Sequence, residues 1–265
     1  MPRLFVKSLS AILAALIVLP TAALAHDTWL LPMRSDSSSA MTFELTSGMD
    51  FPNADYSIPA DRVAARGCRM EVADCILKMG VNGEHALALS ANVAGDTPAL
   101  LWVDLAPKTL SLDGDKVEEY LAEIDPPPSV RAAYMAQPEP RHWRETYVKH
   151  SKALLGTAVS TPTAWSKPVG STLEIVPSAD SRLALDSDAR FRVMSHGKPL
   201  ADFAIGVVGG TAAKPRLLRT DADGDITVRI DQRGYWLLRV TELNPSTTKD
   251  IDWDSHFATL AFDVR

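Results

Sequence analysis

The sequence lacks the features expected of a membrane-embedded or nucleic-acid-binding protein. After residue 25 it contains no apolar run long enough to span a bilayer, which excludes the membrane-embedded part of a transporter. Its 27 lysine and arginine residues are outnumbered by 33 aspartate and glutamate residues, and the net charge is −6. Nucleic acid is therefore not expected as a partner, because binding it requires a basic face that displaces counterions.

The motifs of common enzyme classes are also missing. There is no GxGxxG or Walker pattern for nucleotides, and no Gly-x-Ser-x-Gly nucleophile elbow. Residues 221–225 (DADGD) resemble the front of a calcium loop, but the glycine stands fourth and the EF-hand requires it sixth. A hairpin turn is expected there instead. No enzymatic activity is predicted, although a copper site with an open position, which could activate oxygen, is an open alternative.

Only two cysteines are present, Cys68 and Cys75, seven positions apart. A thiolate metal site would need a closer pair or more thiols. In an exported chain, where oxidising conditions preserve disulfides, a bridge between these two residues is the default expectation.

The first 25 residues have the pattern of a secretory signal peptide. Arg3 and Lys7 form a positive n-region, residues 8–25 are uncharged, and the run ends in Ala-Leu-Ala, a small-residue cleavage pattern. An uncleaved anchor is the alternative, since the uncharged run of 18 residues just reaches the length of a spanning helix. Cleavage after Ala25 predicts a periplasmic protein whose first residue is His26.

Two long parts of the chain have the pattern of β-strands. Short apolar or alternating runs, broken by Gly, Asn and Asp turns, occupy residues 28–112 and return from residue 172 onward. They predict a mainly β fold of two β-sandwich domains, immunoglobulin-like or prealbumin-like, joined by a short helical strap. The predicted bounds are 1–25 for the signal peptide, 26–125 for the N-terminal sandwich, 126–165 for the strap and linker, and 166–265 for the C-terminal sandwich.

Between the two halves the spacing of apolar residues becomes helical. Residues 115–124 fit a helix, which the prolines at 126–128 would end. Residues 141–155 carry Trp143, Tyr147, His150 and Leu154 at steps of three and four. This second segment is therefore expected to be a connecting helix or a helix-like strap.

A histidine at the start of the mature chain is a candidate metal ligand. The α-amine and Nδ1 of His26 can chelate one ion, and one further imidazole completes the arrangement called a histidine brace, which suits copper; imidazole also suits nickel and zinc. The alternative is that a histidine occupies the first position of the mature chain by chance and binds no metal.

The remaining histidines supply the candidate partners. His256 follows an Asp-Trp-Asp-Ser loop directly before the final strand, and it is expected to provide the opposing imidazole. His150, on the apolar side of the strap, is expected to close the site. Alternatively, His256 is a surface residue and His150 a packing residue. Three others are expected to be solvated turn or surface residues: His85, His142 and His196.

Several segments resemble one bacterial periplasmic family. They are 26–32 (HDTWLLP), 147–154 (YVKHSKAL), 220–224 (TDADG), 234–239 (GYWLLR) and 252–260 (DWDSHFATL). The family is a domain of unknown function often labelled as the periplasmic component of nickel uptake, NikM-like. The resemblance implies an exported, β-rich protein associated with transition-metal transport.

Together these patterns predict an exported, periplasmic transition-metal-binding protein that binds copper or nickel at His26, His256 and His150. It would be an accessory to metal uptake or homeostasis, with a membrane transporter or an outer-membrane receptor as its protein partner. The alternative is an envelope interaction or carrier module with neither catalysis nor metal. The metal hypothesis requires at least two imidazoles within about 5 Å of the terminal amine, whereas the alternative leaves the histidines scattered.

Overall fold

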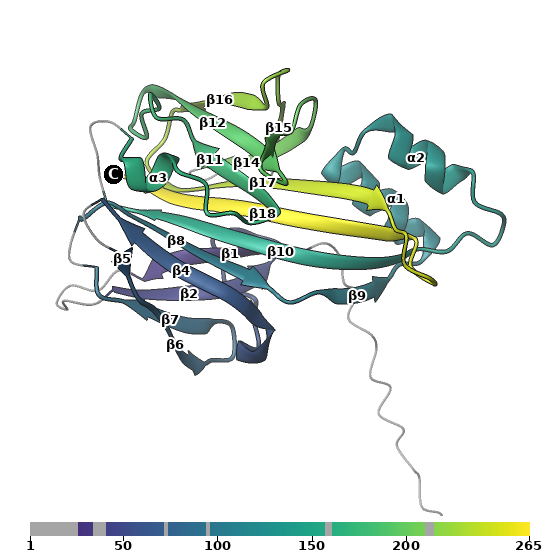
Figure 1. The fold of residues 1–265 in the computed structure, drawn as a ribbon, viewed down its shortest axis with the longest axis horizontal. Helices are drawn as coiled ribbons and strands as arrows, with labels where there is room; N and C mark the ends of the chain where they lie inside the picture. Colours follow the sequence, from purple (N-terminus) through teal and green to yellow (C-terminus); the bar gives the residue numbers. More distant parts are fainter. Residues whose placement is uncertain (1–25, 34–40, 72–73, 94–95, 157–160, 210–214) are drawn as a thin grey trace, which may run out of the picture.

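Three β-sheets stacked in layers form the body of the molecule (Figure 1). The computed structural model describes residues 26–33, 41–71, 74–93, 96–156, 161–209 and 215–265, and the predicted signal peptide lies outside them. The mainly β fold with sandwich-like sheets is confirmed.

Each sheet is named here by its place in the stack. The N-terminal sheet contains β1 (Asp27–Met33), β2 (Met41–Gly48), β3 (Tyr56–Ser57), β6 (Leu77–Asn82) and β7 (Leu87–Ala91). The central sheet contains β4 (Val63–Met70), β5 (Asp74–Cys75), β8 (Ala99–Leu105), β9 (Lys108–Ser111), β10 (Arg144–Leu155), β14 (Ala204–Gly209), β15 (Arg216–Arg219), β17 (Gly234–Pro245) and β18 (Trp253–Val264). The C-terminal sheet contains β11 (Leu173–Pro177), β12 (Ser187–Ser195), β13 (Lys198–Pro199) and β16 (Asp225–Ile230).

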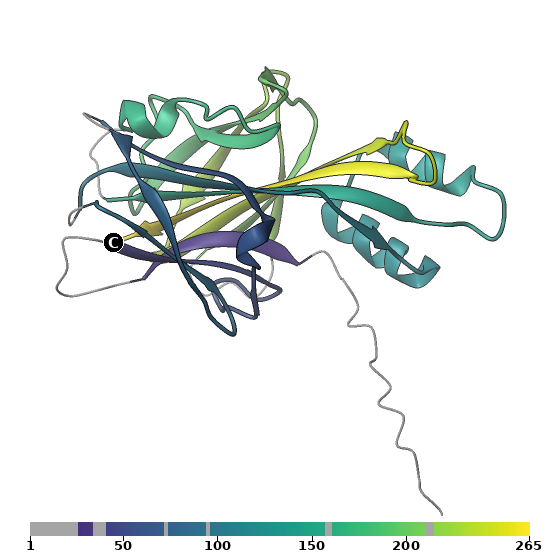
Figure 2. The ribbon, with the colours of Figure 1, turned by 60° about the horizontal axis from the view of Figure 1, so that its bottom comes forward.

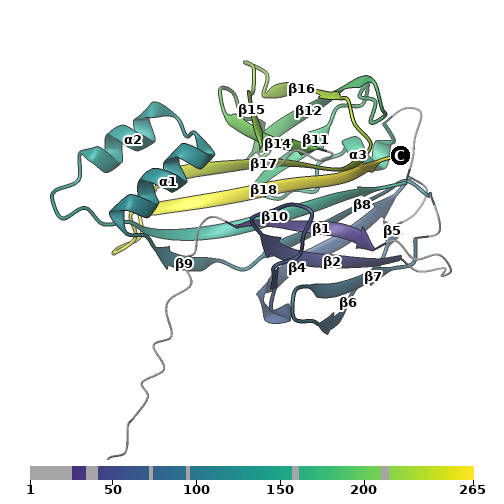
Figure 3. The same cartoon turned by 180° about the vertical axis from the view of Figure 1, so that it is seen from behind.

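The central sheet combines strands from both halves of the sequence. Its middle strand, β10, pairs antiparallel with β8 and parallel with β18, the last strand of the chain (Figure 3). The parallel register runs from Glu145 opposite Trp253 to Ala153 opposite Ala261. Strand β10 lies within the predicted strap and linker of residues 126–165 and is bonded to β18, so the two predicted sandwiches share one sheet.

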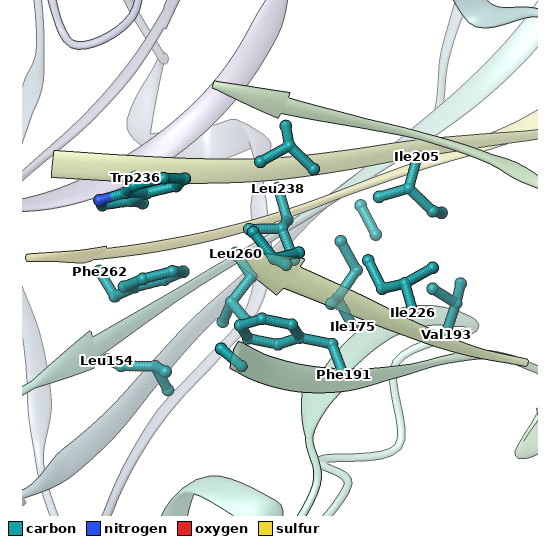
Figure 4. Packing of buried hydrophobic residues seen from close by; sticks show 14 of the residues in the cluster. Leu154, Ile175, Phe191, Val193, Ile205, Ile226, Trp236, Leu238, Leu260 and Phe262 are labelled. Atoms are coloured by element: carbon teal, nitrogen blue, oxygen red, sulfur yellow. The ribbon is translucent and has the colours of Figure 1, made fainter. Parts of the chain in front are cut away.

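An apolar core lies on each face of the central sheet. On one face, side chains of β1, β2 and β7 pack against β4, β8 and β10. On the other face, Ile175 and Phe191 of the C-terminal sheet pack against Trp236, Leu260 and Phe262 of the central sheet (Figure 4). Burial of these side chains on both faces, at roughly 25 cal/mol per Å² of apolar surface, is the main favourable contribution to folding.

Two helices cover one end of the long central strands (Figure 2). Helix α1 (Gly114–Ile124) confirms the helix predicted for residues 115–124, and Val117, Tyr120 and Leu121 form its buried face. Helix α2 (Pro128–Met135) begins at a proline. Proline is tolerated at this position because a backbone N–H in the first turn would have no intrahelical partner, so its absence costs no hydrogen bond. Both helices pack around Trp143 and Trp253. Two short helices complete the element order: η1 (Ala60–Arg62) and α3 (Thr163–Ser166).

The helix expected for residues 141–155 is wrong, because residues Arg144–Leu155 form strand β10. The central sheet is covered on both faces, so the side chains from His150 to Leu155 are all buried and the alternation typical of a half-exposed strand is lost. The helical spacing of the aromatic and histidine side chains in this segment was coincidental.

The predicted disulfide between Cys68 and Cys75 is confirmed, with 5.1 Å between the Cα atoms. The two residues are register partners on the adjacent strands β4 and β5. The bridge therefore closes a short hairpin at the edge of the central sheet.

Candidate metal centre

Strands β10 and β18 bring two of the three predicted ligands into contact. In their parallel register His150 lies opposite Ala258, two positions from His256, so both imidazoles project from the same face of the sheet. The rings are stacked with centroids 5.3 Å apart. Nε2 of His150 lies 3.1 Å from Nδ1 of His256.

A carboxylate on the neighbouring strand fixes the orientation of His150. Asp104 is the register partner of His150 on β8, and its Oδ1 lies 2.7 Å from His150 Nδ1. The Ser171 hydroxyl donates to the same oxygen at 2.8 Å. Because an ionised carboxylate only accepts, His150 carries its proton on Nδ1, and the lone pair of Nε2 points at His256.

The environment of His256 favours the neutral imidazole. Burial, followed by the neighbouring His150, lowers the pKa of His256 to about 4, although Glu242 acts in the opposite direction. A neutral imidazole is the form that binds a metal ion. At neutral pH His256 therefore does not have to lose a proton to solvent before it can bind an ion.

A third imidazole, not expected from the sequence, lies beside this pair. His196 occupies the turn between β12 and β13, and its ring meets the ring of His256 edge-on with centroids 6.2 Å apart. The sequence interpretation grouped His196 with solvated turn residues, and it is indeed exposed. Nothing in a Ser-His-Gly-Lys turn indicates which strand the turn will face. The other two histidines of that group, His85 and His142, are exposed.

His26 lies on the other face of the central sheet. The carbonyl of Thr28 on β1 accepts hydrogen bonds from the hydroxyls of Ser151, at 2.9 Å, and Thr259, at 2.6 Å. These two donors alternate along β10 and β18 with the positions of His150 and His256, and alternate side chains point to opposite faces of a sheet. The structure therefore brings His150 and His256 together and places His26 with β1, on the opposite side.

The surroundings of His26 contain a partly buried cation. The ammonium group of Lys149 donates to the backbone carbonyl of His26, and burial lowers the pKa of Lys149 to about 8. The ring of His26 lies against Tyr56, with centroids 5.1 Å apart. Burial, and next the charge of Lys149, lower the pKa of His26.

The spacing of the histidine pair is compatible with a shared metal ion. An ion at about 2.0–2.1 Å from each nitrogen would subtend an angle of about 100° at the 3.1 Å separation of Nε2 and Nδ1. That angle lies between square-planar and tetrahedral values. Within the described part of the chain, no three His, Cys, Asp or Glu side chains are close enough to hold an ion together. The pair supplies two ligands as it stands.

Comparison with protein-family models identifies the family of this chain. Residues 23–242 match the model of a family described as a domain of unknown function, DUF4198. The chain belongs to the DUF4198 family. The DUF4198 match includes His26, Asp104, His150 and His196, and it ends before His256. No match is found among the curated proteins. None of the helices among the described residues is long and apolar enough to cross a membrane.

Solved structures show only weak similarity to this DUF4198 protein. The D0-D1 domain of intimin is 11% identical, with 89% of this chain and 97% of that chain covered and a TM-score of 0.20. The ectodomain of mouse nectin-like molecule 4 is 9% identical, with coverage of 90% and 64% and a TM-score of 0.18. The FN1-FN3 domains of chicken CNTN1 are 8% identical, with coverage of 90% and 67% and a TM-score of 0.20. Similarity at this level supports no functional inference.

Proposed function

We propose that this chain is an exported transition-metal-binding protein that holds one copper or nickel ion between His150 and His256. The observation that supports this proposal is the 3.1 Å separation of His150 Nε2 and His256 Nδ1. The carboxylate of Asp104 on the far nitrogen of His150 matches the outer-sphere partner that metal-ligating histidines usually have. Binding would replace the hydrogen bond between the two rings by two metal–nitrogen bonds, and the proton on Nδ1 of His256 would be replaced by one on its Nε2, so that the ring stays neutral.

The wider role is an accessory to metal uptake or homeostasis in the periplasm, with a membrane transporter or an outer-membrane receptor as partner. The signal-peptide pattern and the disulfide Cys68–Cys75 are compatible with export. The resemblance to nickel-uptake components is the reason to test nickel beside copper. Most nitrogen sites bind Cu(II) more tightly than Ni(II), in keeping with the Irving–Williams order. Affinity alone will therefore not identify the physiological ion.

His26 is assigned a separate role from the pair. Once freed by cleavage, its α-amine and Nδ1 would form a two-nitrogen chelate on the opposite face of the central sheet. This second chelate is independent of the site at His150 and His256, and experiments on that site need a background in which it is removed.

The experiment is a Cu(II) and Ni(II) titration of the mature chain carrying His26→Ala, with His150→Ala, His256→Ala and His142→Ala added singly. His142→Ala is the control because His142 is exposed. Loss of either ligand should weaken binding by more than the 10- to 100-fold that loss of an outer partner causes. Equal affinities in all four proteins would contradict the metal site and favour the interaction or carrier module.

A further inference from the structure

We infer that His196 is the third protein ligand of the proposed site, and that Glu242 positions it. This inference rests on the proposed function, because it completes the same site. The pair of His150 and His256 offers only two nitrogens, and His196 is the exposed imidazole whose ring meets His256 at 6.2 Å between centroids.

The backbone of the turn that carries His196 is fixed on two sides. The N–H of His196 donates to the carbonyl of Thr172 at 2.7 Å. On the other side, the hydroxyl of Ser195 donates to Oε2 of Glu242 at 2.6 Å, and both of these residues are buried. Glu242 is the register partner of His256 on β17. The turn is therefore tied directly to the strand beside His256.

The side chain of His196 has freedom that its backbone lacks. It is exposed, and among the described residues no hydrogen bond holds its imidazole. Its φ of 50° lies in the left-handed region, which is uncommon for a residue other than glycine. A rotation about its side-chain torsions can therefore reorient the ring beside His256 without moving the turn.

Three imidazoles in graded exposure would make a site that an ion can reach. His150 is buried, His256 is half-buried and His196 is exposed, so the exposed ring would meet the ion first. Imidazole nitrogens suit copper, nickel and zinc. Asp104 stays outside the ligand set, because its oxygen accepts from His150 and Ser171. Glu242 also stays outside, as the acceptor for Ser195.

The test measures Cu(II) affinity by chelator competition and counts nitrogen ligands by electron paramagnetic resonance, in the mature chain carrying His26→Ala. His196→Ala should weaken binding at least tenfold and lower the nitrogen count by one. His142→Ala should change neither. Since His196 is exposed, the variant is expected to fold, and thermal unfolding of the metal-free protein would verify this.

Positioning by Glu242 is tested with Glu242→Gln and Ser195→Ala. Both should weaken binding about tenfold while the nitrogen count stays at three, because the ligand is retained but held less firmly. Wild-type affinity and nitrogen count in His196→Ala, with binding lost in His150→Ala and His256→Ala, would overturn this inference and leave the proposed function standing. Unchanged binding in all three histidine variants would instead overturn the proposed function.

Discussion

Lys149 and His150 are consecutive residues of β10, and their side chains point to opposite faces of the central sheet. Lys149 donates to the backbone of His26 beside β1, whereas His150 donates to Asp104 on the face that carries His256. This alternation separates the N-terminal histidine from the histidine pair. One strand therefore fixes the positions of both proposed sets of nitrogen ligands.

Asp104→Ala should weaken copper binding 10- to 100-fold. The substitution removes the acceptor that orients His150 and keeps its proton on Nδ1. Competition titration of the mature chain carrying His26→Ala would measure the loss. Ser171→Ala is the matched control, because it removes the other hydrogen bond to Asp104 and retains the carboxylate. Equal affinities for Asp104→Ala and Ser171→Ala would contradict the assigned role.

The N-terminal chelate should appear only in the processed protein. Mass spectrometry of protein recovered from the periplasm should give a chain that starts at His26. Copper titration of this chain should give two bound ions, and His26→Ala should reduce the number to one without affecting the site at His150 and His256. A single ion in both proteins would exclude the chelate at His26.

Glu174→Ala should lower the free energy of unfolding by about 3–5 kcal/mol, because it leaves the ammonium group of Lys152 buried without its partner. Glu174 also accepts from the backbone N–H groups of Val169 and Gly170, which the variant would leave unpaired. Urea unfolding measures the change. Asp180→Ala is the control, since its ion pair with Arg190 is exposed and should contribute no more than about 1 kcal/mol. Similar decreases in the free energy of unfolding for the two variants would show that the buried ion pair stabilises the protein no more than the exposed one.

Glu145 should make the protein less stable as the pH rises. Burial raises the pKa of this carboxyl group above its ordinary value, in spite of hydrogen bonds from Ser255, Trp143 and Tyr120. The folded state therefore keeps a proton that the unfolded chain releases near pH 4.5, and unfolding becomes easier from there up to the folded-state pKa.

Urea unfolding of the wild type and of Glu145→Gln across pH 4.5 to 8 checks this prediction. The free-energy difference between the two proteins should change with pH within that window. The exposed Glu118→Gln serves as the control. Parallel curves for wild type and Glu145→Gln would show that the carboxyl group titrates alike in both states.

Features that depend on local sequence could be predicted. Strand propensity and turn residues gave the mainly β fold, and the spacing of Val117, Tyr120 and Leu121 gave helix α1. Two cysteines seven positions apart gave the disulfide. Each of these depends on residues close to one another in the chain.

Features that depend on the pairing of distant strands could not be predicted in the same way. The helical spacing in residues 141–155 was misleading because β10 is buried on both faces. His150 and His256 were both named as candidate ligands beside His26, but they are 106 positions apart and their contact with each other depends on the parallel pairing of β10 and β18. Asp104 and His196 were missed for the same reason, since their contacts with the pair come from neighbouring strands and turns.

The pairing of β10 with the last strand also constrains how the chain is made. Strand β18 occupies residues Trp253–Val264, so β10 and β17 both have unpaired edges until these residues are available. Such exposed edges favour aggregation, and contacts this distant in sequence form slowly. The central sheet can close only after the residues of β18 have been synthesised and, if the chain is exported, only after they have crossed the membrane. Deletion of residues 253–264 would therefore remove the strand that unites both halves of the molecule.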